Sequence, residues 1–338
     1  MAVSIPGRLD PPRLLVLLAD GGLHSGEWLA KELAVSRAAI WKGVQRLRAL
    51  GVGIQALPRR GYCLAAPLEL LDARRVRAEL DPQHRGRLRR FELLFEVDST
   101  NTRLLDAPPP PPGSIDVCLT ELQRAGRGRR GRRWIAPFGA GVAMSAAWTF
   151  SDGASTLPAL SLAVGVAITR ALSRAGALGV ALKWPNDIYF QDRKIGGVLI
   201  ELKAEASGPA HVVIGIGINV ALPAAARREI EAAGVRVAAV ADACPGAPSR
   251  NRVAGAILDE LLSMLWQFER EGFAAFRGAW TALDALRDRP ARVSLADTMV
   301  SGTARGVDGE GALLLDTGAG MRRFVSGEAS LRMIEGDT

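Results

Sequence analysis

Residues 123–134 read Gln-Arg-Ala-Gly-Arg-Gly-Arg-Arg-Gly-Arg-Arg-Trp, and the interpretation of the central part of the chain depends on this stretch. Its glycines match the GxGxxG pattern of dinucleotide-binding proteins, which needs a helix to open directly after them and hold a pyrophosphate. A proline and two more glycines come next instead, and another strand-like run begins at Gly141. We therefore interpret the stretch as a flexible loop whose backbone N–H groups and guanidinium groups clamp an anion. The alternatives are an arginine-rich RNA-binding loop and a loop without a function.

A second motif combines Lys183-Trp-Pro-Asn-Asp187 with Asp192-Arg-Lys194-Ile-Gly-Gly197 around a predicted hairpin. Lysine is rare in this chain and occurs only at positions 31, 42, 183, 194 and 203 among the 43 basic residues. A lysine kept where arginine is the usual choice points to a role that a guanidinium does not fill. Two ammonium groups and two carboxylates suit the making and breaking of a phosphoanhydride, whereas a solvated turn is the plainer interpretation.

Two shorter polar motifs accompany these two. Asp98-Ser-Thr-Asn101 follows a strand-like run and supplies small hydrogen-bonding groups for a polar, uncharged ligand, although a helix cap is the preferred interpretation of this motif alone. Gly215-Ile-Gly-Ile-Asn219 reads as a strand whose glycines permit the close approach of a ligand or of a neighbouring backbone.

The N-terminal residues 10–64 predict three helices and a hairpin, which together form a winged helix-turn-helix. Asp10, Ser25 and Ser36 stand where helix caps are expected. In such a module the third helix enters the major groove of DNA and the hairpin tip contacts phosphates. A protein-interaction or lid domain of the same shape is the alternative. The expected DNA contacts are Ser36, Arg37, Trp41, Lys42, Gln45 and Arg48 on the helix and Arg59 and Arg60 at the tip.

The rest of the chain divides into two further predicted domains. Residues 68–287 alternate strand-like and helical runs, as an α/β body does, and residues 108–112 are a polyproline stretch that predicts a stiff surface loop. Residues 288–338 contain short strands separated by glycine turns, which predict a small β-barrel. The expected domains are therefore 1–67, 68–287 and 288–338.

The amino-acid composition further limits the classes of protein to which the chain can belong. A chain of 338 residues with 48% hydrophobic and 23% charged residues is too long for one small module and too apolar for disorder. Its formal charge of +8 favours polyanionic partners. Three scattered cysteines form neither a disulfide framework nor a zinc motif, which fits a reducing cytosol. No secretory leader is visible, and the longest apolar run, 157–172, is too interrupted to span a membrane.

Taken in order, these motifs closely resemble the bacterial biotin protein ligases, specifically the bifunctional type that also represses biotin operons. The resemblance covers nearly the whole chain, and the pair GRGRRG and KWPND is its most specific part. It implies an α+β multidomain protein with an N-terminal winged helix-turn-helix, a central α/β ligase domain with a mixed sheet like that of class II synthetases, and a C-terminal SH3-like β-barrel.

By this resemblance, biotin and ATP give biotinyl-5′-AMP and pyrophosphate, and biotin is then transferred to a lysine of the biotin carboxyl carrier protein of acetyl-CoA carboxylase. ATP enters with Mg²⁺, and no protein-held metal is implied. The implied catalytic residues are Arg129, Lys183, Asp187 and Lys194. The implied biotin-binding residues are Ser99, Thr100, Asn101, Gln123, Gly126, Arg127, Gly128, Arg129, Lys194 and Gly197. The implied nucleotide-binding residues are Arg129, Arg130, Trp134, Lys183, Asn186 and Asn219.

The resemblance also implies operator DNA as a partner, a homodimer in the adenylate-bound state and a cytoplasmic location. Two other functions remain open. A lipoate–protein ligase shares the catalytic architecture, although GRGRRG and the two flanking domains favour the biotin branch. A transcription factor that senses biotin without turnover is the second, and the retained lysines argue against it. Residues 221–251, expected to cover the adenine, contain no motif that can be mapped.

Overall fold

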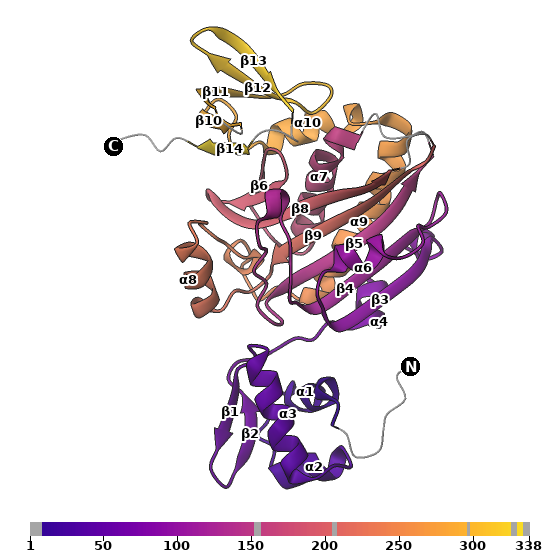
Figure 1. Cartoon of the computed structure of the whole chain (residues 1–338), viewed down its shortest axis with the longest axis vertical. Coiled ribbons are helices and arrows are strands. Elements are labelled where there is room, and N and C mark those ends of the chain that lie inside the picture. The colour runs from indigo at the N-terminus through magenta and orange to yellow at the C-terminus, as the bar shows by residue number, and fades with distance from the viewer. Residues whose placement is uncertain (1–8, 152–156, 205–207, 296–297, 326–329, 334–338) are drawn as a thin grey trace. The chain divides into compact units, whose positions relative to one another are not determined.

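A computed structural model of the chain describes residues 9–151, 157–204, 208–295, 298–325 and 330–333 (Figure 1). The described chain separates into two compact units. The first contains residues 9–71 together with 137–139, and the second contains the other described residues from 72 onward. Each unit has its own hydrophobic core, so each is described separately.

The first unit is the predicted winged helix-turn-helix. Its elements are α1 (Pro11–Leu18), α2 (Gly26–Glu32), α3 (Arg37–Ala49), β1 (Ile54–Leu57) and β2 (Gly61–Leu64). Ser25 and Ser36 cap α2 and α3, since each hydroxyl accepts a backbone N–H at 3.1 Å. The antiparallel hairpin of β1 and β2 forms the wing. Leu14, Leu15 and Leu18 of α1 are fully buried, as are Ile40 and Val44 of α3.

The predicted cap at Asp10 is wrong in one respect. Asp10 occupies the N-cap position of α1, but its side chain makes no capping hydrogen bond. Pro11 and Pro12 fill the first two helical positions, so the N–H groups that a cap usually satisfies are largely missing.

The second unit is built on a seven-stranded mixed sheet in the order β3-β4-β5-β9-β8-β7-β6 (Figure 1). Only β3 and β4 are parallel among these neighbours, because helix α6 (Thr100–Leu105) lies between them in the chain and lets the chain return in the same direction. The mixed sheet predicted for the ligase domain is therefore confirmed. Its strands are β3 (Leu88–Val97), β4 (Ile115–Gln123), β5 (Gly141–Phe150), β6 (Val180–Lys183), β7 (Asp187–Phe190), β8 (Arg193–Ala204) and β9 (Ala210–Asn219).

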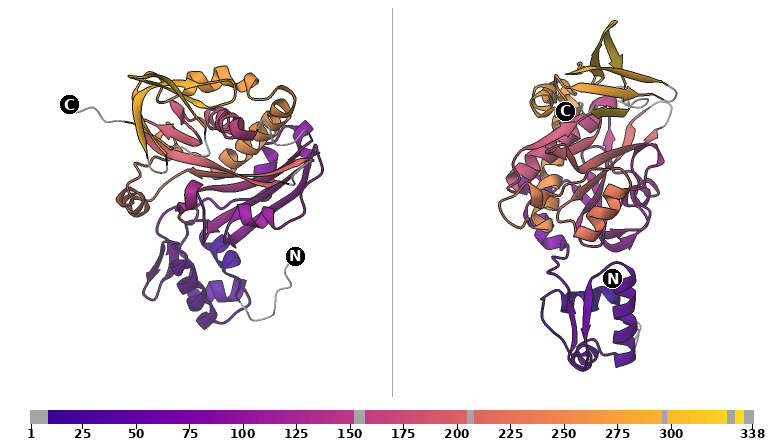
Figure 2. Two further views of the ribbon diagram at one scale, coloured as in Figure 1. Left: turned by 45° about the horizontal axis from the view of Figure 1, so that its top comes forward. Right: turned by 90° about the vertical axis from the view of Figure 1, so that its left-hand side faces the viewer.

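Helices cover both faces of this sheet (Figure 2). On β5, Trp148 points to α9 and makes an edge contact with Trp266, whereas Ser145 points to α6 and lies near Asn101. This alternation gives the sheet an apolar face under α7 and α9 and a partly polar face under α6. The α-helices are α4 (Ala73–Ala78), α5 (Pro82–Arg85), α6 (Thr100–Leu105), α7 (Leu160–Arg174), α8 (Ala224–Ala232), α9 (Arg250–Glu271) and α10 (Ala274–Leu283), with 3-10 turns η1 (Arg129–Gly131), η2 (Leu157–Ala159) and η3 (Val240–Asp242).

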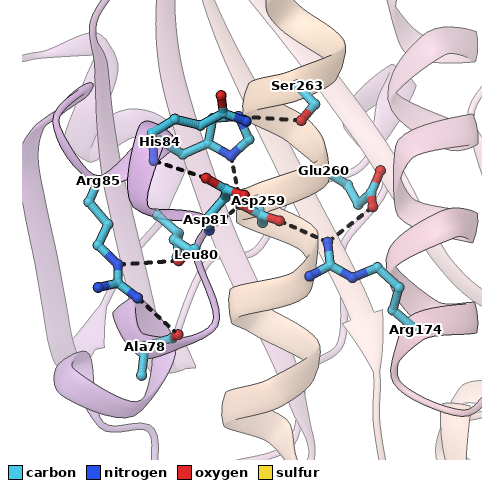
Figure 3. A network of polar contacts seen from close by, with 10 residues as sticks. Ala78, Leu80, Asp81, His84, Arg85, Arg174, Asp259, Glu260 and Ser263 are labelled. Atoms are coloured by element: carbon cyan, nitrogen blue, oxygen red, sulfur yellow. Dashed lines mark hydrogen bonds and ion pairs between the residues drawn. The ribbon is translucent and has the colours of Figure 1, made fainter.

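A polar network fastens the segment of α4 and α5 to α9 (Figure 3). The carboxylate of Asp259 accepts the backbone N–H of Asp81 at 2.8 Å, lies 2.6 Å from His84 Nδ1 and accepts from Arg174 at 2.8 Å. Burial of Asp259 raises its pKa, but these hydrogen bonds outweigh burial and hold the pKa below its usual value. The charged carboxylate is thus the common anchor of three separate elements.

The C-terminal strands form an antiparallel sheet in the order β13-β12-β11-β10-β14. Its edge strands β13 and β14 are not hydrogen-bonded to each other in the described residues, so the predicted SH3-like domain is present without a closed ladder. Trp184 Nε1 donates to Gly311 O at 3.1 Å, and Arg289 pairs with Asp192 at 2.9 Å, which joins this sheet to the ligase body. The strands are β10 (Pro290–Ser294), β11 (Met299–Val307), β12 (Leu313–Thr317), β13 (Gly320–Phe324) and β14 (Ser330–Met333).

The polyproline stretch is a surface loop, as predicted, with Pro108, Pro111 and Pro112 exposed. It follows α6 and leads into β4, and Pro110 is buried with its carbonyl accepting the Thr149 hydroxyl at 2.6 Å. Within the part of the chain that the structure describes, no helix combines the length and apolar character that crossing a bilayer requires.

Candidate active site

A large cavity of about 820 Å³ lies in the second unit. The end of β4, the glycine-arginine loop (residues 124–134), the β6–β7 hairpin, β8 and β9 line it, together with residues 230–237 and parts of the C-terminal sheet. Every residue predicted to bind biotin or nucleotide or to act in catalysis reaches this cavity except Gly126. The motifs that are separate in the sequence are therefore brought to one place by the sheet.

The floor of the cavity is formed by the Ser99–Asn101 motif at the start of α6. Ser99 caps the helix, because its hydroxyl accepts the Thr102 N–H at 3.4 Å, and it also lines the cavity. Gln123 Oε1 accepts the Thr100 N–H at 2.9 Å, which fixes the Gln123 side chain at the end of β4. The cap interpretation of this motif is thus confirmed, and the same residues form part of the cavity.

Two glycines of β9 are required by the side chains that lie against them. A Cβ on Gly215 would stand 2.3 Å from Asn101 Oδ1, and one on Gly217 would stand 2.6 Å from the indole of Trp134. The close approach predicted for this strand is therefore made by side chains that also line the cavity. Asn219 ends the same strand, where its amide donates to Ala238 O at 3.2 Å.

The glycine-arginine loop closes on itself by backbone hydrogen bonds. Gly128 N donates to Arg132 O at 2.7 Å, and Trp134 N donates to Gly126 O at 2.9 Å. Gly126 faces Trp134 at close range and so does not line the cavity as predicted. The loop holds only the short 3-10 turn η1 before β5 begins, which confirms that it is no dinucleotide fingerprint.

Arginines of this loop line the cavity and give it a positive electrostatic potential. Burial of Arg129, together with the nearby Arg130, lowers the pKa of the Arg129 guanidinium, and Asp187 partly opposes this. Arg129 Nη1 reaches Asn186 Oδ1 at 3.5 Å. Arg130 itself has a left-handed backbone with φ of 57°, a conformation that non-glycine residues adopt at a cost of about 1 to 3 kcal/mol.

The lysine-rich motif forms the predicted hairpin of β6 and β7, with a cis Trp184–Pro185 bond in its turn. Lys194 Nζ donates to Asp187 Oδ1 at 2.5 Å and lies 5.9 Å from the centre of the Trp134 ring. Lys183 Nζ donates to the Tyr189 hydroxyl at 3.1 Å. Both ammonium groups therefore line the cavity in fixed positions rather than lying in solvent.

Several cavity residues were not foreseen. Burial raises the pKa of the Tyr189 phenol, which keeps it a neutral acceptor for Lys183. Residues 230–237 contribute one wall through the end of α8 and the segment that pairs with Lys194, although this alanine-rich region offers no motif. Arg292 of the C-terminal sheet also lines the cavity. Only the proximity of Tyr189 to KWPND could have signalled one of these residues.

The predicted DNA contacts are divided between surface and structural positions. Arg37, Lys42, Arg59 and Arg60 are exposed, and Trp41 is 56% exposed on α3. Two others also have structural roles: Ser36 caps α3, and the Arg48 guanidinium donates to Ile54 O at 2.8 and 3.1 Å and so ties the helix to the wing.

The cavity thus combines a hydrogen-bonding floor, fixed ammonium and guanidinium groups and one carboxylate paired with an ammonium. Such an arrangement can bind a polar uncharged group at the floor and anionic oxygens beside the cations. A cavity of this size takes a ligand of nucleotide dimensions.

Comparison with known proteins assigns the class. Residues 94–219 match the model of the biotin/lipoate A/B protein ligase family, 13–63 match an HTH domain, and 290–332 match the biotin protein ligase C terminal domain. The chain is 39% identical over 329 residues to the bifunctional ligase/repressor BirA of Escherichia coli (strain K12), covering 96% of this chain and 98% of that protein. It therefore belongs to the biotin/lipoate A/B protein ligase family.

Further comparisons agree with the bifunctional type. The bifunctional ligase/repressor BirA of Bacillus subtilis (strain 168) is 29% identical over 330 residues, covering 94% of this chain and 97% of that protein. The biotin protein ligase from Aquifex aeolicus, solved in complex with biotin and ATP, superposes with a TM-score of 0.62 at 28% identity, covering 73% of this chain and all of that one. The relatives do not favour the lipoate ligase or the sensor without turnover.

Proposed function

We propose that this protein is an ATP-dependent biotin ligase that also represses transcription through its N-terminal domain. The observation that carries the proposal is the meeting of the Ser99–Asn101 floor, the glycine-arginine loop and the Lys183–Lys194 hairpin in one cavity. The similar biotin protein ligase from Aquifex aeolicus was solved in complex with biotin and ATP, which supports these two ligands for the cavity. We further propose that the chain is divided into three domains, 1–67, 68–287 and 288–338.

In the first step, a carboxylate oxygen of biotin attacks the α-phosphorus of ATP and pyrophosphate leaves, which gives biotinyl-5′-AMP. ATP is taken up with its Mg²⁺ as the substrate complex. Ser99, Thr100, Asn101 and Gln123 bind the ureido ring, and the loop residues Arg127, Gly128 and Arg129 cover biotin and the α-phosphate, with Gly126 acting only through its contact with Trp134. Lys194 neutralises the two negative groups as they approach, and Gly197 leaves room for its ammonium.

The nucleotide occupies the remaining side of the cavity. Lys183 and Arg130 hold phosphate oxygens, while Trp134, Asn186 and Asn219 shape the surface against the nucleoside. The wall at residues 230–237 supplies the apolar side chains Ile230, Val235 and Val237, which suit an adenine ring. We therefore assign these residues the role of covering the adenine, for which residues 221–251 offered no recognisable motif in the sequence.

In the second step, the ε-amine of a lysine on the biotin carboxyl carrier protein attacks the acyl carbon, and AMP leaves. That amine has a usual pKa of about 10.4 and must lose a proton to become a nucleophile. Asp187 lies at the cavity with Lys194 as its hydrogen-bonding partner, and we assign it the task of orienting the amine and accepting the proton. The closed loop excludes water from the mixed anhydride.

The N-terminal unit binds operator DNA through α3 and the wing, with Arg37, Trp41, Lys42, Gln45, Arg59 and Arg60 at the contact surface and Ser36 and Arg48 holding the helix in place. A homodimer in the adenylate-bound state would link biotin demand to repression. All three cysteines are free, which fits a cytoplasmic location.

The test is ATP–pyrophosphate exchange on the purified chain with biotin, with lipoate and with neither. Exchange with biotin alone is the expected result. Exchange with lipoate would move the chain to the sister activity, and tight biotin binding without exchange would leave only a sensor. Sedimentation with and without biotin and ATP tests the homodimer, and an unchanged monomer would exclude it.

A further inference from the structure

Glu201 lies on β8, outside the cavity lining, yet it contacts two residues that line it. Its Oε2 accepts the Asn101 amide at 2.7 Å. The same carboxylate pairs with Arg127, whose Nη2 lies 3.1 Å from Oε1 and 3.0 Å from Oε2. One carboxylate thus joins the floor of the cavity to the loop above it.

The contact with Asn101 sets the direction of a line of hydrogen bonds. An ionised carboxylate only accepts, so Asn101 must present its NH₂ to Glu201 and its Oδ1 to Ser145, which lies 2.5 Å away. Ser145 is fully buried and carries one hydrogen, which Asn101 Oδ1 requires. Thr100 Oγ1 lies 2.6 Å from Ser145 Oγ and 3.1 Å from Gln123 Oε1, so its single hydrogen has two acceptors within the network.

This order of hydrogen bonds determines which donor and acceptor groups Thr100 and Gln123 offer to a ligand. Whichever of these two oxygens takes the Thr100 hydroxyl hydrogen, that hydrogen stays within the network, and a lone pair of Thr100 Oγ1 is left to accept from a ligand N–H. Gln123 lines the cavity, and because its Oε1 already accepts the Thr100 N–H, the NH₂ group is the part of this amide that remains as a donor. Floor positions with one acceptor and one donor side by side match a ureido group, which offers both N–H and C=O.

The contact with Arg127 acts on the loop instead. Arg127 is 45% exposed and its partner 28%, so the ion pair is screened by solvent and contributes modestly. It is nonetheless an ion pair that ties the glycine-arginine loop to β8. Its loss is expected to loosen the loop without unfolding the sheet.

We propose that Glu201 is a positioning residue for the ligase reaction, fixing the polarity of the biotin pocket through Asn101 and the resting position of the glycine-arginine loop through Arg127. The role of Glu201 in the biotin pocket, through Asn101, rests on the proposed function. Its role in holding the loop, through Arg127, does not depend on any ligand.

The experiment separates the role in the biotin pocket from the role in the loop by comparing Glu201→Ala and Glu201→Gln in the full-length chain. Alanine removes both contacts, whereas glutamine keeps an amide oxygen for Asn101 and loses the charge that pairs with Arg127. Glu92→Gln is the matched control, because Glu92 forms a similar two-oxygen pair with Arg103, at 2.9 and 3.2 Å, with exposed fractions of 21% and 51%. Biotin Kd is measured by calorimetry, and tryptic cleavage within residues 127–133 by mass spectrometry without ligand.

Glu201→Ala should raise the biotin Kd roughly tenfold or more, because a buried amide loses its charged acceptor. Glu201→Gln should leave the Kd within about threefold but speed loop cleavage about two- to fivefold, as expected for a screened ion pair. In an Arg127→Gln background, Glu201→Gln should add nothing to cleavage at the remaining arginines. If both Glu201 variants behave as Glu92→Gln does, the assignment is wrong.

Two safeguards keep the outcome readable. Should Glu201→Ala fail to fold, as judged by its thermal midpoint, Glu201→Gln and Arg127→Gln still test whether Glu201 holds the loop through Arg127. Should the wild-type chain fail to bind biotin, the proposed function is wrong, while faster loop cleavage in Glu201→Gln would still support the positioning of the loop.

Discussion

Gly215→Ala is the most informative single substitution that the cavity offers. An added Cβ would stand 2.3 Å from Asn101 Oδ1 and 2.9 Å from both Cγ and Nδ2, whereas ordinary contacts begin at 3.4 Å. Strand β9 is paired on both sides, so the backbone at Gly215 has little freedom to retreat. The Asn101 amide must therefore shift by about 1 Å, a displacement that a close-packed interior resists.

The energetic cost arises from the two bonds that such a shift breaks. Asn101 would lose its contact with Ser145 at 2.5 Å and its charged contact with Glu201 at 2.7 Å. A neutral hydrogen bond contributes about 1 kcal/mol and a charged one about 1.5 to 3 kcal/mol. The free energy of unfolding should fall by about 3 kcal/mol, which lowers the thermal midpoint by roughly 6 to 12 °C. Biotin affinity should fall roughly 10- to 100-fold, since the floor loses its arrangement.

Differential scanning calorimetry and biotin titration measure both effects. Gly246→Ala is the control, because nothing lies within 4 Å of its added Cβ and its backbone is not left-handed. If Gly215→Ala keeps the thermal midpoint and the biotin Kd of the wild type, Asn101 does not pack against this glycine and the described floor is wrong.

Four other predictions concern separate parts of the molecule. Lys194→Ala should slow biotin-dependent ATP–pyrophosphate exchange at least about 100-fold, and a near-normal rate would remove its catalytic role. Burial raises the pKa of Asp284 from 3.8 to about 6, so the folded state holds this proton more tightly and stability falls as pH rises from about 4 to 6. Asp284→Asn should therefore raise the unfolding free energy by about 1 to 3 kcal/mol at pH 7.5 but not at pH 4, and an equal change in urea titrations at both values would contradict this. Asp259→Ala leaves a buried histidine and an arginine without their common carboxylate and should cost about 3 kcal/mol, whereas an unchanged thermal midpoint would show that the network is dispensable. Arg59→Gln with Arg60→Gln should reduce the slope of log K against log salt for DNA binding by about 1 for each phosphate that the wing no longer neutralises, and an unchanged slope would place the wing away from DNA.

Much of the fold is determined by local sequence signals. Short strand-like runs indicated the central strands, and serines before apolar periods located α2 and α3, because these signals act within a few residues. The interpretation of residues 123–134 as a loop also depended only on the proline and glycines that come directly after Trp134. The order of strands in the sheet could not be obtained this way, since β5 pairs with β9 across a long separation in the chain.

The site was predictable where chemistry and motif coincide, as at Lys183, Asp187 and Lys194. It was not predictable where a residue acts through shape or through a distant partner. The apolar wall at 230–237 is composed of ordinary residues, and Glu201 matters only because α6 and the loop both pack against β8. Such partnerships are set by tertiary packing, which leaves no periodic trace in the sequence.

The placement of Trp134 and Trp41 gives the protein two built-in optical probes. Trp134 lines the cavity beside Lys194, so a ligand entering there changes the surroundings of its indole. Trp41 is 56% exposed on α3 of the other unit, where binding to DNA would shield it from a dissolved quencher. Because Trp148 and Trp280 are almost wholly buried and do not line the cavity, they supply a steady background. Replacing either probe with phenylalanine would let fluorescence follow small-molecule and DNA occupancy separately in one unlabelled chain.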